Sequence, residues 1–82
     1  MIKLLEGVRV TKQFRLEHEH YLKNLDTLSV YLCQEHDDDV LLKLMKLEFE
    51  GKQRFAHLER IMSRYNKLRY RREKKELLEA GL

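Results

Sequence analysis

The sequence contains no proline, no tryptophan, one cysteine and only three glycines among its 82 residues. Proline and glycine are the residues that most often break helices, so their scarcity predicts long helices with few interruptions. The lone Cys33 excludes an internal disulfide and suggests a reducing compartment or a buried thiol, and we expect a free buried thiol. No apolar run approaches the ~20 residues that a membrane-spanning helix needs. We therefore expect a cytoplasmic protein without a membrane partner.

Charged residues, by contrast, are abundant. The chain has 17 Lys and Arg against 14 Asp and Glu, which gives a net charge of +3. Together with leucine, these residue types are typical of long or coiled helices. The positive balance favours anionic partners only mildly. A chain of this length is one domain at most, so we treat residues 1–82 as a single helical domain.

Apolar and aromatic residues at alternating spacings of four and three predict a first helix over residues 11–34. The residues that form this stripe are Phe14, His18, Tyr21, Leu25, Leu28 and Leu32. The same register runs back through Thr11, Gly7 and Leu4. Residues 1–10 are therefore either a helical extension that starts near residue 2 or an N-terminal arm that ends before Thr11.

The acidic run Asp37–Asp39 predicts the start of a second helix, because aspartate is a good N-cap and acids suit the positive end of a helix dipole. We expect this helix over residues 38–80, since the next strong stop signal is Gly81. Gly51 lies inside it and could mark a kink, a close helix crossing or a break into two helices, and we favour one helix, whether straight or bent. The sequence thus predicts an all-α antiparallel helical hairpin with a long second helix.

Seven apolar residues surround the beginning of the second helix, and we call them the apolar girdle. They are Val40, Leu41, Leu42, Leu44, Met45, Leu47 and Phe49. A helix that is apolar all round must be buried, and one neighbouring helix cannot cover it. We therefore expect the girdle to form an interface in a dimer or higher oligomer, most simply a homodimer in which two hairpins make a four-helix bundle. The alternative is a monomeric three-helix fold in which the N-terminal arm is the third layer.

The most distinctive segment, residues 64–75, reads RYNKLRYRREKK. Five cations here and just before it recur at helical spacing, with no acid three or four residues away to neutralise them. We call them the basic ridge: Arg60, Arg64, Lys67, Arg71 and Lys74. By contrast, Arg69, Arg72 and Lys75 each have a glutamate four residues on and are expected to pair along the helix. The ridge predicts an anion-binding face, beside which Tyr70 could stack on a nucleobase.

Signs of chemistry are few. Glu17 and His20 form an E-x-x-H pair, as in di-iron helical bundles, but the sequence has no second pair and His20 falls off the core stripe. A metal-dependent bundle is therefore the least favoured reading. His18 lies on the stripe and is expected to be a histidine in the core or at its edge, with its hydrogen bonds satisfied. There is no glycine-rich phosphate loop. We expect no enzymatic activity, no cofactor, no metal and no small-molecule substrate.

The sequence thus favours a small non-enzymatic protein–protein interaction module, a regulator or an adaptor. In this hypothesis the homodimer presents its basic ridge to an acidic protein surface, which includes the acidic turn at Glu35 and Asp37–Asp39 of the second subunit. The alternative is a nucleic-acid-binding protein that uses the same ridge, with an affinity that depends strongly on salt.

Overall fold

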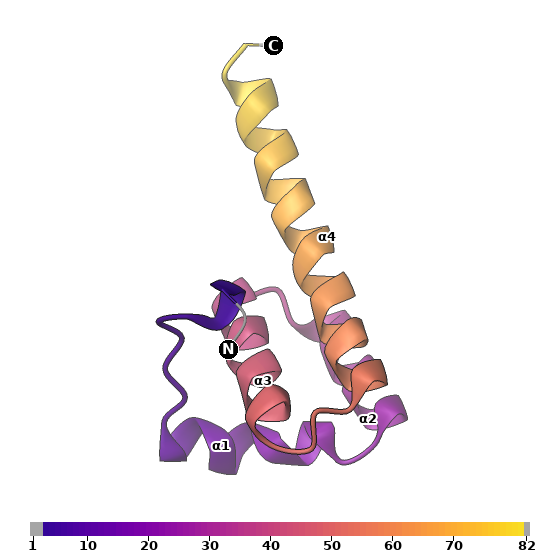
Figure 1. Cartoon of the computed structure of the whole chain (residues 1–82). Coiled ribbons are helices and arrows are strands. Elements are labelled where there is room, and N and C mark those ends of the chain that lie inside the picture. Colours follow the sequence, from indigo (N-terminus) through magenta and orange to yellow (C-terminus); the bar gives the residue numbers. More distant parts are fainter. Residues whose placement is uncertain (1–2, 82) are drawn as a thin grey trace.

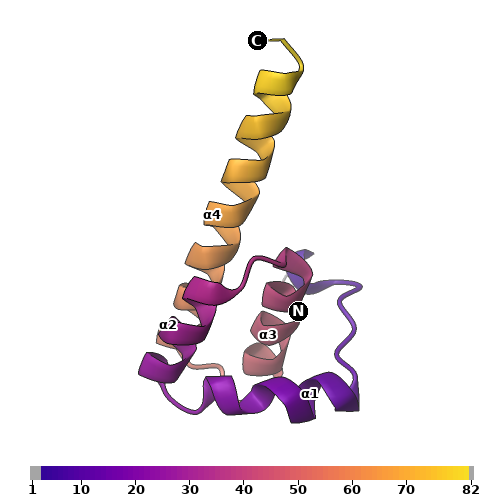
Figure 2. The same cartoon turned by 180° about the vertical axis from the view of Figure 1, so that it is seen from behind.

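A computed structural model describes residues 3–81, and all of their regular structure is helical, as predicted. The four α-helices are α1 (Lys12–His18), α2 (Leu25–Gln34), α3 (Asp38–Glu50) and α4 (Phe55–Glu79), and two short 3-10 helices are η1 (Lys3–Leu5) and η2 (Glu19–Leu22). Helix α4 packs against both α2 and α3, while α1 and η2 run across one end of these helices (Figures 1 and 2). At the opposite end α4 projects well beyond the rest of the chain.

The single helix predicted over residues 11–34 is divided into α1, η2 and α2. The chain turns at Lys23 and Asn24, where Asn24 has an extended backbone (φ −147°, ψ 167°). Its Oδ1 accepts a hydrogen bond of 2.8 Å from the N–H of Thr27 and so caps α2. Because the apolar spacing continues through the turn without interruption, periodicity alone predicted one helix where there are two.

The long helix predicted over residues 38–80 is also divided, and the predicted two-helix hairpin is replaced by four shorter helices. Helix α3 ends at Gly51, where an added Cβ would lie 3.1 Å from the carbonyl oxygen of Leu47. Gln53 then takes a left-handed φ of 52°, and its N–H donates to the carbonyl of Glu48 at 2.8 Å. The chain reverses here, so α3 and α4 run in opposite directions (Figure 1).

Both outer ends of that predicted helix are where the sequence places them. Helix α3 starts at Asp38 with Asp37 as its N-cap, whose carboxylate accepts from the N–H of Asp39 at 2.9 Å. Helix α4 ends at Glu79, and Gly81 follows with a left-handed φ of 89°. Glycine takes this conformation without the steric cost of a side chain, which makes it a common helix stop.

Residues 3–11 form an arm instead of a helical extension of α1. Thr11 caps α1 by accepting from the N–H of Phe14 at 3.1 Å. The alternative start near residue 2 lies outside the described residues. The arm lies against α3, because Leu5 is fully buried and the Nζ of Lys46 donates to the carbonyl of Val8.

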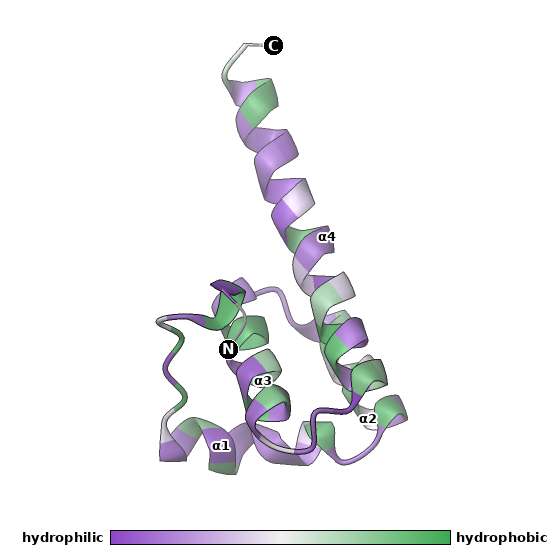
Figure 3. Cartoon of the chain, viewed as in Figure 1, coloured by the Kyte–Doolittle hydropathy of each residue, from purple (hydrophilic) through white to green (hydrophobic). Residues whose placement is uncertain are grey.

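The apolar girdle is covered largely by its own chain. Leu41, Leu44, Met45 and Leu47 are at most 8% exposed, and the remaining three, Val40, Leu42 and Phe49, are partly buried against the same core. Helix α4, η1 and η2 all contact α3, and Figure 3 shows the hydrophobic residues concentrated there, while the projecting half of α4 is mostly hydrophilic. A second subunit cannot reach the four buried residues. The girdle therefore does not present the uncovered apolar surface from which a homodimer interface was predicted, because several segments of the same chain pack on α3 and not one neighbouring helix.

Candidate functional site

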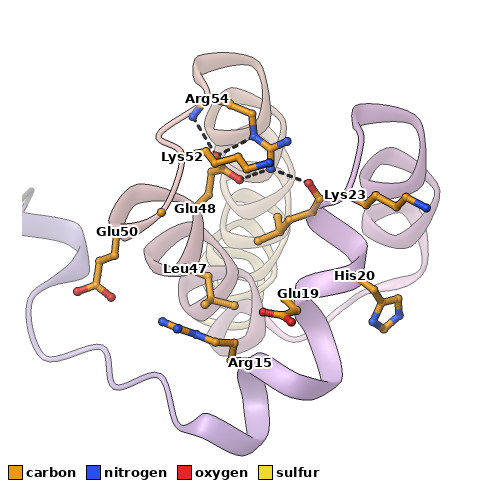
Figure 4. A pocket seen from close by; sticks show the side chains of 11 residues that line it. Arg15, Glu19, His20, Lys23, Leu47, Glu48, Glu50, Lys52 and Arg54 are labelled. Atoms are coloured by element: carbon orange, nitrogen blue, oxygen red, sulfur yellow. Dashed lines mark hydrogen bonds and ion pairs between the residues drawn. The ribbon is translucent and has the colours of Figure 1, made fainter.

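A buried ion pair joins α3 to the start of α4. The carboxylate of Glu48 is only 2% exposed and accepts three hydrogen bonds from Arg54: from the backbone N–H (2.9 Å), from Nε (3.0 Å) and from Nη2 (2.8 Å). The same Nη2 donates to the carbonyl of Leu22 at 2.6 Å. Figure 4 shows the two side chains pointing toward one another. The pair thus ties η2, α3 and α4 together.

This ion pair borders an open hollow of about 520 Å³, but the role of the pair is to stabilise the fold. Burial tends to raise the pKa of Glu48, yet the hydrogen bonds and positive charge of Arg54 outweigh it and lower that pKa. Glu48 is therefore ionised near neutral pH, and both of its carboxylate oxygens are already occupied. A carboxylate held in this way is unsuited to serve as a general base.

His57 lies close to this pair and is 6% exposed. Neither of its ring nitrogens has a hydrogen-bond partner among residues 3–81. Burial, followed by the positive charge of Arg54, lowers the pKa of His57. The ring is therefore held neutral in the folded chain, and acidification must disfavour the fold.

We expect His57→Leu to reduce the loss of stability between pH 7.5 and pH 5.5. Below the ordinary histidine pKa of about 6.5, the unfolded chain binds a proton that the folded chain resists. The contribution of His57 to stability is thus complete above that pH and is lost as the pH falls toward the lowered pKa of the folded state. The lowered pKa of Glu48 affects stability only at more acidic pH, around and below the ordinary glutamate pKa of about 4.3.

Urea unfolding at the two pH values measures this effect. The exposed His20 provides the matched control, and His20→Leu should leave the pH difference of the native chain in place. An undiminished pH difference in His57→Leu would show that another group carries it.

The inner part of the basic ridge contacts α2. Arg64 donates to the carbonyl of Glu35 through Nε (3.2 Å) and Nη2 (3.0 Å), and Nη2 also lies 3.3 Å from the Nδ1 of His36. Arg60 is exposed, and its Nη1 lies 3.4 Å from the hydroxyl of Ser29. Arg64 therefore caps the C-terminal end of α2, a structural role that spacing along α4 did not reveal.

The outer part of the ridge is free of such contacts. Lys67, Arg71 and Lys74 are exposed and make no hydrogen bond or ion pair with any other residue of the described chain. Tyr70 is 65% exposed beside them. The ridge that was predicted as one surface is thus divided into a part bound to α2 and a part open to solvent.

The neighbouring arginines and lysine behave partly as predicted. Arg69 pairs with Glu73 and Lys75 pairs with Glu79, each at 3.9 Å, which confirms two of the three pairs expected along the helix. Arg72 instead pairs with Asp38 at the start of α3.

The acidic turn between α2 and α3 is therefore held by cations of the same chain, Arg64 on one side and Arg72 on the other. Burial tends to raise the pKa of Glu35, but hydrogen bonds from the Tyr31 hydroxyl (2.5 Å) and from two backbone N–H groups of the turn lower it. Two of the four acids of this turn are thus already engaged, Asp38 with Arg72 and the Glu35 carboxylate with Tyr31, so the predicted docking of the ridge on a second subunit's acidic turn loses part of its basis.

The residues singled out for metal or thiol chemistry lie apart. His18 is partly buried, its Nδ1 lies 3.0 Å from the carbonyl of Phe14 and its ring stacks on that of Phe14, which confirms a satisfied histidine. Glu17 accepts from Gln13 at 2.7 Å. Within residues 3–81, no three His, Cys, Asp or Glu side chains gather as a metal site requires. The prediction of a buried thiol at Cys33 is wrong, because Cys33 is exposed. Its position next to Leu32, off the apolar stripe, could have indicated this exposure.

Comparison with family models, curated proteins and solved structures found no match for this chain. Among the described residues, no helix combines the length and apolar character that crossing a bilayer requires.

Proposed function

We propose that the protein is a non-enzymatic helical interaction module that binds an acidic partner protein through the projecting half of α4. The observation that carries this proposal is the exposure of every residue from Arg69 to Gly81 on a helix that extends beyond the core. Three of these residues are large and apolar: Tyr70, Leu77 and Leu78 are 65%, 55% and 63% exposed.

The spacing of these residues suits a helix that lies in a groove of another protein. Tyr70, Lys74 and Leu77 stand at positions i, i+4 and i+7, which places two apolar anchors on one side of α4. Arg71 and Lys74 flank the anchors with positive charge, so the complementary surface is an apolar groove with an acidic rim. Apolar side chains exposed on an otherwise charged helix add little to the stability of their own chain, and a partner would bury them.

The homodimeric four-helix bundle is not part of this proposal, because its supporting argument was the exposure of the apolar girdle. A partner of different sequence suits the ridge better than a second copy of this chain, in whose acidic turn Arg72 already pairs with Asp38 and Arg64 already donates to the carbonyl of Glu35.

We expect Tyr70→Ser combined with Leu77→Ser to abolish partner binding while the fold is retained. Both side chains lie outside the core, so the free energy of unfolding should change by less than about 1 kcal/mol. The test is affinity capture from cell extract with the whole chain as bait, after nuclease treatment, followed by measurement of the purified pair. Arg71→Glu combined with Lys74→Glu should also abolish capture.

Leu16→Ser is the matched control, since Leu16 is 63% exposed on α1, away from the projecting helix. Capture that persists in both α4 variants, or that is lost equally in Leu16→Ser, would place the partner site elsewhere.

A nucleic-acid-binding protein is the second candidate, favoured by the exposed row of Lys67, Arg71 and Lys74 beside Tyr70. The same variants separate the two functions. Binding to random duplex or single-stranded DNA should fall steeply between 50 and 200 mM salt and should be lost in Arg71→Glu/Lys74→Glu. Absence of binding at low salt removes this candidate. Arg64→Glu is unsuitable for either test, because it would also remove the cap of α2.

A further inference from the structure

At the base of the basic ridge, α2 and α4 enclose a groove of about 300 Å³. Its polar lining comes from Ser29 and Cys33 on α2 and from Arg60, Ser63, Arg64 and Lys67 on α4. None of the residues that line it is acidic, although the chain as a whole has almost as many acids as cations. Three cations and two hydroxyls therefore face a common space.

We propose that this groove binds the phosphate group of a phosphorylated small molecule or of free phosphate. The proposal goes beyond the function argued above, which uses the projecting half of α4. It concerns a separate site at the inner end of the same helix, and either one can fail without the other.

The donors in the groove match a tetrahedral dianion. Arg60 has further N–H groups besides the one near Ser29, and Lys67 has three ammonium hydrogens without a partner in residues 3–81. The hydroxyls of Ser29 and Ser63 can donate from the two walls. A phosphate monoester presents three terminal oxygens and close to two negative charges at neutral pH. A carboxylate has only two oxygens and one charge, so it would leave donors on one wall unused.

Arg64 prepares the site in two ways. Its bonds to the carbonyl of Glu35 fix the guanidinium in place, which lowers the entropy lost when a ligand binds. These bonds also satisfy the carbonyl of Glu35 at the C-terminal end of α2, where the negative end of the helix dipole disfavours an anion. Arg64 also lines the groove, and its Nη1 hydrogens take no part in these bonds.

Titration with inorganic phosphate and phenyl phosphate, followed by NMR of the whole chain at pH 7.5, tests the site. We expect saturable shifts of the Ser29, Cys33 and Ser63 amides and of the Arg60 side-chain N–H, beyond those that sodium chloride gives at equal ionic strength. Arg60→Gln and Lys67→Gln should each weaken binding about tenfold, the loss expected for one charged hydrogen-bonding group. Both residues are exposed, so the fold should persist.

Lys74→Gln is the matched control, because Lys74 carries the same charge on the same helix but does not line the groove. Shifts reproduced by sodium chloride, or an affinity unchanged in Arg60→Gln and Lys67→Gln, would overturn the proposal. A parallel titration with decathymidylate distinguishes a phosphate monoester from the phosphodiester backbone of a nucleic acid as the ligand. Suppose that the oligonucleotide shifts the groove amides while phenyl phosphate has no effect beyond that of sodium chloride. The groove is then part of a surface that binds a polynucleotide, and the proposed monoester site is refuted.

Cys33 supplies an independent readout, since the chain has a single cysteine and it lines the groove. Alkylation of Cys33 by neutral iodoacetamide should slow as phenyl phosphate saturates the groove, and it should slow equally in Lys74→Gln. A rate that does not respond to phenyl phosphate at saturating concentration would contradict occupation of the groove.

Discussion

Arg54→Ala is expected to lower the free energy of unfolding by about 3 kcal/mol, because it leaves a buried carboxylate without its counter-charge. The Glu48 carboxylate accepts hydrogen bonds from the backbone N–H, the Nε and the Nη2 of Arg54. In Arg54→Ala only the hydrogen bond from the backbone N–H can remain. The substitution also removes the donor to the carbonyl of Leu22, so η2 loses its polar link to α4. An 82-residue domain has roughly 4–12 kcal/mol of stability in total. The loss is therefore a large part of the whole.

Urea unfolding with a matched set of variants measures this loss. Arg69→Ala removes an exposed arginine that is paired with Glu73 at 3.9 Å, and it should change the stability by less than about 1 kcal/mol. Adding Glu48→Gln to Arg54→Ala removes the buried charge and should restore part of the loss. Equal effects of Arg54→Ala and Arg69→Ala would mean that Glu48 is solvated and that the pair is not a core interaction.

Helix ends were predictable from the sequence where a capping residue also interrupts the apolar pattern. Asp37 and Gly81 do so, and both mark real helix ends. Asn24 is an equally good cap, but Leu25 and Leu28 continue the spacing of Phe14 and Tyr21 across it. Two helices that share a register by coincidence cannot be distinguished from one helix by periodicity. A search for capping residues inside periodic segments would have identified this turn.

The Glu48–Arg54 pair escaped prediction for a related reason. Leu41, Leu44 and Glu48 follow one another at spacings of three and four, so an acid continues the most buried stripe of α3. That position was a signal of a buried charge that needs a partner. The identity of the partner was beyond local reasoning, since Arg54 comes into reach only because the chain reverses between Gly51 and Arg54.

The basic ridge shows which part of a surface site local sequence can specify. Counting acids three and four positions away correctly separated Arg69 and Lys75, which pair along α4, from the ridge cations. It could not see that Arg64 and Arg72 reach across to the turn between α2 and α3, because those contacts join residues about thirty positions apart in the sequence. For the outer cations, where α4 has no neighbour, the sequence correctly indicated that no acid of the described chain pairs with them.

Leu44→Ala is expected to cost about 3 kcal/mol of unfolding free energy, the typical penalty for removing buried methyl groups and leaving a cavity. Leu44 is fully buried between α3 and its neighbours, and the same substitution at the exposed Leu77 should have almost no effect. The measurement that matters most is the dependence on protein concentration. If one chain covers the girdle, the unfolding midpoint of the native chain and of Leu44→Ala should stay constant over a hundredfold dilution.

A dimer held by the girdle makes the opposite prediction, because dissociation is then coupled to unfolding and the midpoint falls on dilution. In that case Leu44→Ala would shift the mass measured by light scattering toward the monomer before the chain unfolds. An unfolding midpoint that stays constant on dilution and one that falls are qualitatively different results. Dilution therefore decides whether the seven apolar residues that the sequence assigned to a subunit interface belong instead to the core of a single chain.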